Sequence, residues 1–286
     1  MRILLTGAKG QVGRCFKDRL PETWELIAAD SKTLDITDPA AVERMINTFE
    51  PDAVVNAAGY TAVDNAEHEL AKAFKINAHG VRNLAQASFR TGARFIHLSS
   101  DYVFDGAAKR PYTEIDAPNP QNTYGRSKLA GELLALVSNP DSIIIRTSWV
   151  FSEYGNNFVK KILSAAREQS EVQAVNDQIG NPTYAGDLAQ TMISILEKPM
   201  FHQGLYHYCG NPPVSRYDLA LAILHAAQEH NPDFQPAPLV GIGSSDAGTE
   251  YALRPSYTAL SCHKIQEAGI PPSDWQTALH TVISKL

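Results

Sequence analysis

The chain has 286 residues, 44% of them apolar, which is enough for one large domain with a smaller one appended. Its formal net charge is −6 and it has no dense block of Lys and Arg, so neither a nucleic acid nor an anionic membrane is expected as a partner. Three scattered cysteines argue against a disulfide framework, and no apolar run reaches the length of about 18 residues that a membrane span requires. We expect a soluble, cytoplasmic protein.

Short apolar runs alternate with helix-like segments over the first half of the chain. Strands are predicted at residues 2–6, 26–29, 53–55, 95–98 and 142–145. Helices are predicted at 12–20, 39–49, 124–137, 187–196 and 275–286. Asp38 and Pro39 are residue types that commonly begin a helix. This alternation predicts an α/β fold, a Rossmann-like doubly wound parallel sheet.

One further helix is predicted after the third strand. Its apolar residues repeat with a period near 3.6 and should form one buried stripe: Leu70, Phe74, Val81, Leu84 and Ala85. Beyond about residue 150 the pattern loosens, and prolines interrupt the stretch from 212 to 238. The change of pattern favours a smaller C-terminal lobe.

A glycine-rich loop joins the first predicted strand to the first helix. Gly7, Gly10 and Gly13 stand at G-x-x-G-x-x-G spacing. Glycine permits a tight turn and lets a pyrophosphate approach the backbone, and the N-terminus of the following helix favours the phosphate charge. The loop therefore predicts a dinucleotide-binding site, although an ordinary glycine turn is the simpler alternative.

Asp30 ends the second predicted strand, where an acidic side chain can accept hydrogen bonds from the adenosine ribose. Its charge would repel a 2′-phosphate and so favours NAD. Lys9 and Arg14 can offset that repulsion, which leaves NADP open. A solvated carboxylate at the end of a strand is the alternative interpretation.

Tyr124 and Lys128 are four residues apart and share one face of a predicted helix. A ketone that accepts hydride needs a proton on its oxygen, and a nearby ammonium group stabilises the phenolate that a tyrosine becomes when it donates one. Ser99 and Ser100 end the fourth predicted strand, at the sheet edge where ligands of parallel sheets bind. This combination predicts carbonyl reduction.

These motifs together resemble the extended short-chain dehydrogenase/reductases, and within them the dTDP-4-dehydrorhamnose reductases. The resemblance covers nearly the whole chain. It is carried by six segments: 7–13, 56–64, 99–104, 124–128, 146–151 and 176–178.

The resemblance implies NADPH or NADH as the cofactor and assigns a set of residues to it. These are Gly7, Gly10, Gln11, Val12, Gly13, Asp30, Asp35, Ile36, Ala57, Ala58, Gly59, Tyr60, Thr61, Leu98, Tyr124 and Lys128. It implies that Tyr124, Lys128 and Ser100 are catalytic, with Ser100 in place of a family threonine. The residues implied for the substrate are Ser100, Asp101, Tyr102, Trp149 and Arg254. Trp149 offers a flat apolar face to a deoxysugar or base, with core packing as the alternative.

The implied reaction is reduction of the C4 ketone of a nucleotide-linked 4-ketosugar, with Tyr124 as proton donor. Reduction to another sugar, such as a 6-deoxytalose, stays open, as does a non-catalytic regulatory subunit that binds a dinucleotide. A 4,6-dehydratase is disfavoured because Tyr102 stands where those enzymes have a glutamate.

Some relatives dimerise around a magnesium ion held by glutamates, but this chain has Cys15 at one such position and Gly186 near the other. We expect no metal, and a monomer or a weak homodimer. Residues 1–150 and about 175–205 are expected to bind the dinucleotide, and about 151–174 and 206–286 to form the substrate-binding lobe. His97 is expected in the core, and the remaining histidines show no metal-binding spacing.

Overall fold

The computed structural model describes residues 1–246, 248 and 252–286. Six strands form one parallel sheet in the order β10-β5-β4-β3-β1-β2. Their bounds are β1 Arg2–Thr6, β2 Glu25–Ala29, β3 Ala53–Asn56, β4 Arg94–Ser100, β5 Ile143–Thr147 and β10 Gly204–His207. The strand order reverses between β1 and β3, which is the point where such sheets bind ligands beyond their carboxyl ends. The predicted Rossmann-like fold is confirmed.

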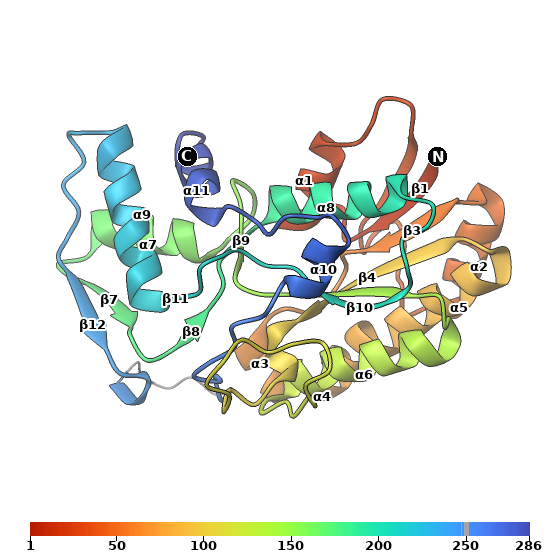
Figure 1. Cartoon of the computed structure of the whole chain (residues 1–286), viewed down its shortest axis with the longest axis horizontal. Helices are drawn as coiled ribbons and strands as arrows, with labels where there is room; N and C mark the ends of the chain where they lie inside the picture. Colours follow the sequence, from red (N-terminus) through yellow and green to blue (C-terminus); the bar gives the residue numbers. More distant parts are fainter. Residues whose placement is uncertain (247, 249–251) are drawn as a thin grey trace.

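Helices cover both faces of this sheet (Figure 1). On one face α1 (Gln11–Asp18) packs against α8 (Ala185–Glu197), and on the other α5 (Val81–Thr91) packs against α2 (Pro39–Phe49) and α6 (Thr123–Ser138). Side chains along β1 alternate between the two layers. Ile3 and Leu5 enter the first core and Leu4 the second, because successive side chains of a strand point to opposite faces.

The predicted long helix after β3 is divided into four segments. They are α3 (Val63–His68), α4 (Leu70–Phe74), the π-helical turn η1 (Lys75–Gly80) and α5. A π-turn takes more residues than an α-turn and shifts the phase of every residue before it. Leu70 is consequently 54% exposed, whereas Val81 and Leu84 are buried. The prediction of one continuous stripe is therefore wrong at Leu70.

The smaller lobe has its own core and lies beyond the carboxyl ends of the sheet, at the left of Figure 1. Its strands pair as β7 with β12, β8 with β11 and β6 with β9. The strands are β6 Val150–Phe151, β7 Val172–Val175, β8 Ile179–Gly180, β9 Thr183–Tyr184, β11 Val214–Ser215 and β12 Leu239–Ile242. The helices of this lobe are α7 Phe158–Glu168, α9 Arg216–His230 and α11 Trp275–Ile283. Three short elements remain: α10 His263–Glu267 packs beside β10, the 3-10 turn η2 Asp101–Val103 packs beside α6, and a second 3-10 turn is η3 Ser244–Asp246.

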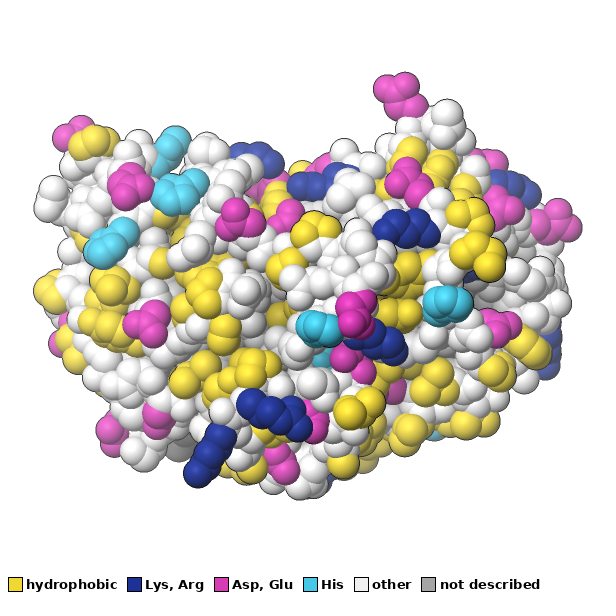
Figure 2. Space-filling view, viewed as in Figure 1, with side chains coloured by type: hydrophobic (Ala, Val, Ile, Leu, Met, Phe, Trp, Pro, Cys, Tyr) yellow, Lys and Arg dark blue, Asp and Glu magenta, His cyan; other side chains and the backbone are white. Residues whose placement is uncertain are grey.

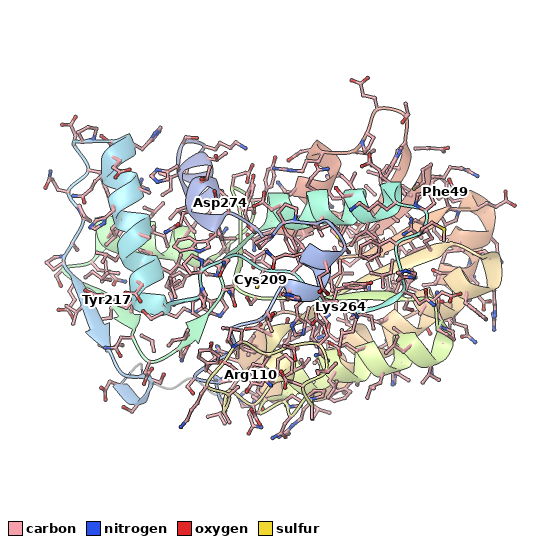
Figure 3. All side chains as sticks on the ribbon, viewed as in Figure 1. Phe49, Arg110, Cys209, Tyr217, Lys264 and Asp274 are labelled. Atoms are coloured by element: carbon pink, nitrogen blue, oxygen red, sulfur yellow. The ribbon has the colours of Figure 1, made fainter. Side chains whose placement is uncertain are left out.

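The chain passes more than once between the sheet and this lobe. The expected boundary at residue 206 falls inside β10, which pairs over its whole length with β5 in the main sheet. Leu260, Ile265 and Ile270, expected in the lobe, also pack in the main core. Figure 3 labels Cys209 near the middle of the molecule, where the chain leaves β10. That boundary therefore does not follow the packing.

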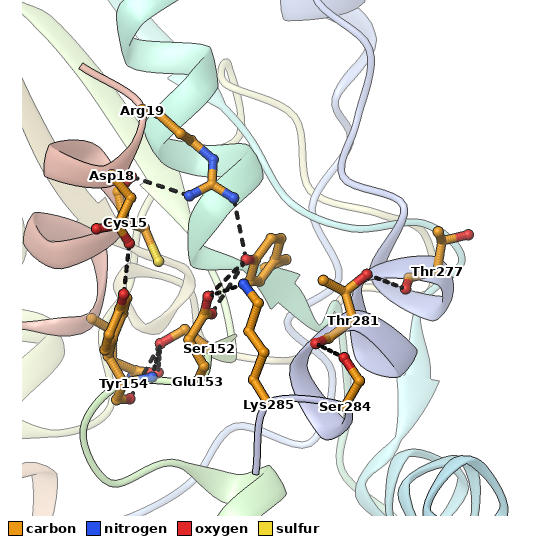
Figure 4. Close-up of polar contacts among 12 residues, drawn as sticks. Cys15, Asp18, Arg19, Ser152, Glu153, Tyr154, Thr277, Thr281, Ser284 and Lys285 are labelled. Carbon is orange, nitrogen blue, oxygen red and sulfur yellow. Dashed lines mark hydrogen bonds and ion pairs between the residues drawn. The ribbon is translucent and has the colours of Figure 1, made fainter. Parts of the chain in front are cut away.

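A polar cluster ties the C-terminal end to the main domain (Figure 4). Lys285 Nζ lies 2.6 Å from Glu153 Oε1, and the Tyr184 hydroxyl lies 3.2 Å from both Arg19 Nη2 and Glu153 Oε2. A Cβ at Gly186 would lie 2.3 Å from Arg19 Nη2. A guanidinium thus occupies the space beside the position where the resemblance puts a metal-binding glutamate.

The surface carries both signs of charge, and Figure 2 shows acidic and basic side chains interspersed on the visible face. Apolar side chains are exposed on α6, where Leu133 is 57% and Val137 81% exposed. Within the described ranges, no helix combines the length and apolar character that crossing a membrane requires.

Candidate active site

A cleft of about 660 Å³ opens at the carboxyl ends of β1, β3 and β4. Every residue predicted to bind the cofactor lines it except Gly13 and Tyr60. Gly13 lies beneath the loop, where a Cβ would be 2.3 Å from the carbonyl oxygen of Gly7. The Tyr60 hydroxyl turns away to the carboxylate of Glu69. The cleft therefore brings together almost all of the predicted set.

Close packing against β3 explains the first glycine of the loop. Gly7 has φ +72°, and a Cβ there would lie 2.5 Å from the backbone of Ala57. Gly10 is the N-cap of α1 and has no capping side chain. The amide groups of the first turn of α1 consequently stay open at the cleft, as a phosphate would require.

Asp30 is already engaged by its own turn. Its Oδ1 accepts the amide hydrogens of Lys32 at 2.8 Å and Thr33 at 3.0 Å, and its Oδ2 pairs with Lys9. The Lys9 ammonium, together with these amides, holds the pKa of Asp30 well below its usual range. Lys9 and Lys32 also line the cleft, so the negative charge expected to exclude a 2′-phosphate is offset.

Tyr124 lies in the first turn of α6, and its hydroxyl is hydrogen-bonded to Ser100 at the end of β4. Burial and the nearby Asp101 and Tyr102 raise the pKa of Tyr124, and the Ser100 hydrogen bond only partly opposes them. The phenol is therefore neutral at physiological pH, which suits a proton donor. The expected lowering of this pKa by Lys128 is not found.

Lys128 instead donates from Nζ to the carbonyl oxygen of Leu98 at 2.6 Å and is 5% exposed. Burial lowers the pKa of Lys128 to about 8, opposed by the charge of Glu132. Nζ would lie 4.0 Å from a Cβ at Gly59, so the ammonium faces the backbone that follows β3. From there it can also donate to a group bound in the cleft.

Two buried hydroxyls of the cleft fit a polar cofactor. Ser99 Oγ and Thr147 Oγ1 have no hydrogen-bond partner within the described ranges. Both residues line the cleft, at the ends of β4 and β5. Buried polar atoms are rarely left unpaired, so these two are suited to hydrogen-bond a ligand such as the polar end of a dinucleotide.

Three of the predicted substrate residues, Ser100, Asp101 and Tyr102, lie beside Tyr124. Asp101 is 2% exposed and accepts hydrogen bonds from Ser100 at 3.0 Å and Thr258 at 2.6 Å. Burial raises its pKa to about 6. The Tyr102 ring meets Tyr124 edge-on, with 5.8 Å between centroids.

Trp149 and Arg254 complete this side of the site. Trp149 has φ +43°, a strained backbone conformation for a residue with a Cβ. Its indole packs so closely on Gly180 that a Cβ there would lie 2.5 Å from the ring. Arg254 Nη2 donates to Asp64 Oδ2 at 2.7 Å.

Sequence reasoning missed several residues of the site. Lys32, Thr147 and Asn156 line the cleft, and Arg216 stacks on the Trp149 ring with its Cζ 3.6 Å from the ring centroid. Lys32 lies two residues beyond Asp30, so its place in the turn could have been inferred. Arg216 belongs to α9 of the smaller lobe, and no local sequence pattern predicts that it reaches the site.

The histidines take no part in the cleft. His97 is 0% exposed and lies in the core, hydrogen-bonded to Asn56, as predicted. Over residues 1–246, 248 and 252–286, no three His, Cys, Asp or Glu side chains are grouped so that they could hold a metal ion.

Comparison with known proteins adds independent evidence. The family model described as RmlD substrate binding domain matches residues 1–286. A dTDP-4-dehydrorhamnose reductase of Aggregatibacter actinomycetemcomitans is 44% identical over 98% of both chains. The structure of a dTDP-4-dehydrorhamnose reductase from Clostridium acetobutylicum is 36% identical, with a TM-score of 0.93 over 99% of this chain and 98% of that one. One from Bacillus anthracis, in complex with NADP, is 33% identical, with a TM-score of 0.93 over 100% and 99%.

Proposed function

Because this chain belongs to the family of the RmlD substrate binding domain, we propose that it reduces the C4 ketone of dTDP-4-dehydro-L-rhamnose to dTDP-L-rhamnose. It is an oxidoreductase that uses NADPH or NADH. The observation that carries this proposal is that Tyr124 and Lys128 line one cleft with the glycine loop, while Ser100 is hydrogen-bonded to Tyr124.

The proton comes from Tyr124. When bound in the cleft, the nicotinamide would supply the hydride for C4 of the sugar. As negative charge develops on the ketone oxygen, the neutral phenol of Tyr124 donates its proton to that oxygen, which completes the secondary alcohol. Ser100, which donates to Asp101 Oδ1 in the structure, would turn its hydroxyl hydrogen to the same oxygen and hold it beside the phenol. Lys128, on the same face of α6, helps to hold Tyr124 in place, and solvent returns a proton to the phenolate.

The glycine loop and its neighbours position the cofactor. The amides at the start of α1 bind the pyrophosphate, and the turn at Asp30 binds the adenosine ribose. Lys128, which already donates to the carbonyl oxygen of Leu98, also donates to the nicotinamide ribose. The hydroxyl groups of Ser99 and Thr147 form hydrogen bonds to the same ligand.

The smaller lobe covers the sugar nucleotide. Asp101, Tyr102 and Trp149 contact the sugar, and Arg254 contacts the diphosphate. In this division of labour, residues 1–150 with about 175–205 bind the dinucleotide, and about 151–174 with the residues after β10 bind the substrate. Binding far from the ketone orients it for reaction.

We expect the enzyme to act as a monomer or weak homodimer in the cytoplasm. Arg19 stands beside Gly186, so a cation of the protein occupies space that a metal-bridged contact would need. Sedimentation of the purified protein tests this directly. A dimer that dissociates on adding a chelator would contradict it.

The test of the function is turnover with authentic substrate. Purified protein, NADPH or NADH and freshly made dTDP-4-dehydro-L-rhamnose should give oxidised cofactor and dTDP-L-rhamnose in equal amounts. Oxidation with a product of the opposite C4 configuration would identify a reductase of the 6-deoxytalose type. No oxidation by protein that binds both cofactors would contradict the proposal and favour a regulatory subunit.

A further inference from the structure

Arg216 reaches the site from the smaller lobe. It is the first residue of α9, whose start is fixed by a capping box in which Ser215 Oγ accepts the amide hydrogen of Asp218 at 2.9 Å. Figure 3 labels the next residue, Tyr217, at this end of α9. The Arg216 guanidinium lies over Trp149, 3.6 Å from its ring centroid, and 5.1 Å from that of Phe158. Two aromatic rings of the lobe thus fix its direction.

The same guanidinium contacts the main domain. It is hydrogen-bonded to Tyr102, which itself packs against Tyr124, and it lies within the electrostatic range of Asp101 and Arg254. Arg216 therefore links Trp149, which packs against the core of the smaller lobe, to Tyr102 of the main domain. Its side chain is partly exposed, so a ligand can reach it.

Among the residues that the structure describes, no Asp or Glu forms an ion pair with Arg216. Asp101, whose charge acts on Arg216, already accepts hydrogen bonds from Ser100 and Thr258 at its two oxygens. A guanidinium has five N–H donors, and stacking on Trp149 with one bond to Tyr102 leaves most of them available.

Arg254 brings a second guanidinium to this region, anchored to Asp64. Two neighbouring cations repel each other unless an anion lies between or beside them. Guanidinium groups match phosphate oxygens in geometry and bind them through two parallel hydrogen bonds. A diphosphate, with two adjacent charged groups, satisfies both arginines at once.

We infer that Arg216 binds the diphosphate of the nucleotide-linked substrate together with Arg254, while its stacking on Trp149 holds the guanidinium plane in place. The inference rests on the proposed function, since it takes the diphosphate of that substrate as the ligand. It adds a binding residue delivered by the lobe, which makes substrate binding depend on the contact between the two lobes.

The experiment measures binding of dTDP, which carries the diphosphate and cannot be reduced, to the NADP⁺-loaded protein by calorimetry. Thymidine, which lacks the phosphates, is titrated in parallel. Arg216→Met keeps the length and the contact with Trp149 but removes the charge and the donors, and Arg216→Lys restores the charge alone. Arg167→Met is the matched control, because Arg167 also stacks on an aromatic ring of this lobe, 5.6 Å from the Phe234 centroid.

Arg216→Met should weaken dTDP binding by roughly tenfold to a hundredfold, the range of hydrogen bonds to a charged group. Thymidine binding and the melting temperature should change little, Arg216→Lys should recover part of the affinity, and Arg167→Met should behave as the wild type. Equal losses for dTDP and thymidine, or unchanged dTDP binding, would overturn the inference in favour of a purely structural clamp. Wild-type protein that binds dTDP but reduces no ketosugar would contradict the proposed function and leave this site standing.

Discussion

Two opposite charges, those of Asp30 and Lys9, lie together in the cleft. Asp30 would repel a 2′-phosphate, yet Lys9 pairs with it and lies at the same end of the cleft. We predict that Lys9→Ala raises the KM for NADPH about tenfold, the size of one partly screened charge interaction, and leaves that for NADH nearly unchanged. Lys17→Ala, on the exposed side of α1 outside the cleft, is the control. Equal changes for both cofactors would contradict a role at the 2′ position.

We expect Lys128 to set the alkaline limit of activity. Burial lowers its pKa to about 8, so its proton is lost as the pH rises above that value, and with it the positive charge proposed to hold the nicotinamide ribose. We predict that kcat/KM, which reports the free enzyme, declines above about pH 8. Arginine stays charged throughout this range, so the pH limit should disappear in Lys128→Arg even if activity is lower. A limit that persists in this variant would assign it to another group.

Residues in local motifs could be predicted from the sequence, whereas residues that meet across the fold could not. The glycine loop and the Tyr124–Lys128 pair are recognisable because their chemistry depends on spacing along the chain. The sequence leaves the pairing of Asp30 with Lys9 open, because it depends on the three-dimensional geometry of the loops that carry them. Arg216 had no local signature at all.

At the scale of elements, α6 holds Tyr124 and Lys128 against the π-turn. Gly131 permits this packing, because a Cβ there would lie 2.0 Å from the carbonyl oxygen of Asn77. Gly131→Ala should cost about 1–3 kcal/mol of stability despite the better helix propensity of alanine, and lower kcat through displacement of α6. Leu133→Ala, at an exposed position of the same helix, should be nearly neutral in unfolding and activity assays. A Gly131→Ala variant as stable and active as the wild type would contradict this account.

A buried ion pair fixes α6 to β5. Glu132 accepts two hydrogen bonds from Arg146, at 2.9 and 2.7 Å, and both side chains are almost fully buried. Glu132→Ala should lower the free energy of unfolding by about 3–5 kcal/mol, because it leaves an unpaired buried charge. The double variant Glu132→Met/Arg146→Met should recover most of that loss in denaturant unfolding. A double variant no more stable than Glu132→Ala would show that packing, not charge, dominates.

The elements themselves were predictable where one local rule governs them. Residues 39–49 form α2 as predicted, and the side chain of Asp38 accepts the amide hydrogens of Ala40 and Ala41. The helix after β3 was not predicted correctly. Its phase shifts at η1, where Asn77 bonds to the backbone of Tyr60 instead of following the apolar pattern. The position of Asn77 therefore depends on Tyr60, which is 17 residues away in the chain.

At the scale of the whole molecule, the sheet could be predicted and the interleaving of the two lobes could not. Alternating strands and helices lead directly to a doubly wound sheet. The late return of β10 to that sheet, and of Leu260 and Ile265 to its core, follows from packing that a four-residue strand just before a proline-rich stretch does not reveal. The consequence is functional, since Arg216 and Arg254 approach the cleft from segments that follow β10.

The central claim is that Tyr124 gives the proton while the rest of the cleft binds and orients. The most direct measurement compares wild type and Tyr124→Phe for cofactor oxidation with dTDP-4-dehydro-L-rhamnose and, separately, for NADPH affinity. We predict that kcat falls roughly 10²–10⁴-fold, the range expected for loss of a general acid, while NADPH binds with nearly unchanged affinity. Turnover close to that of the wild type in a folded Tyr124→Phe protein would contradict the account.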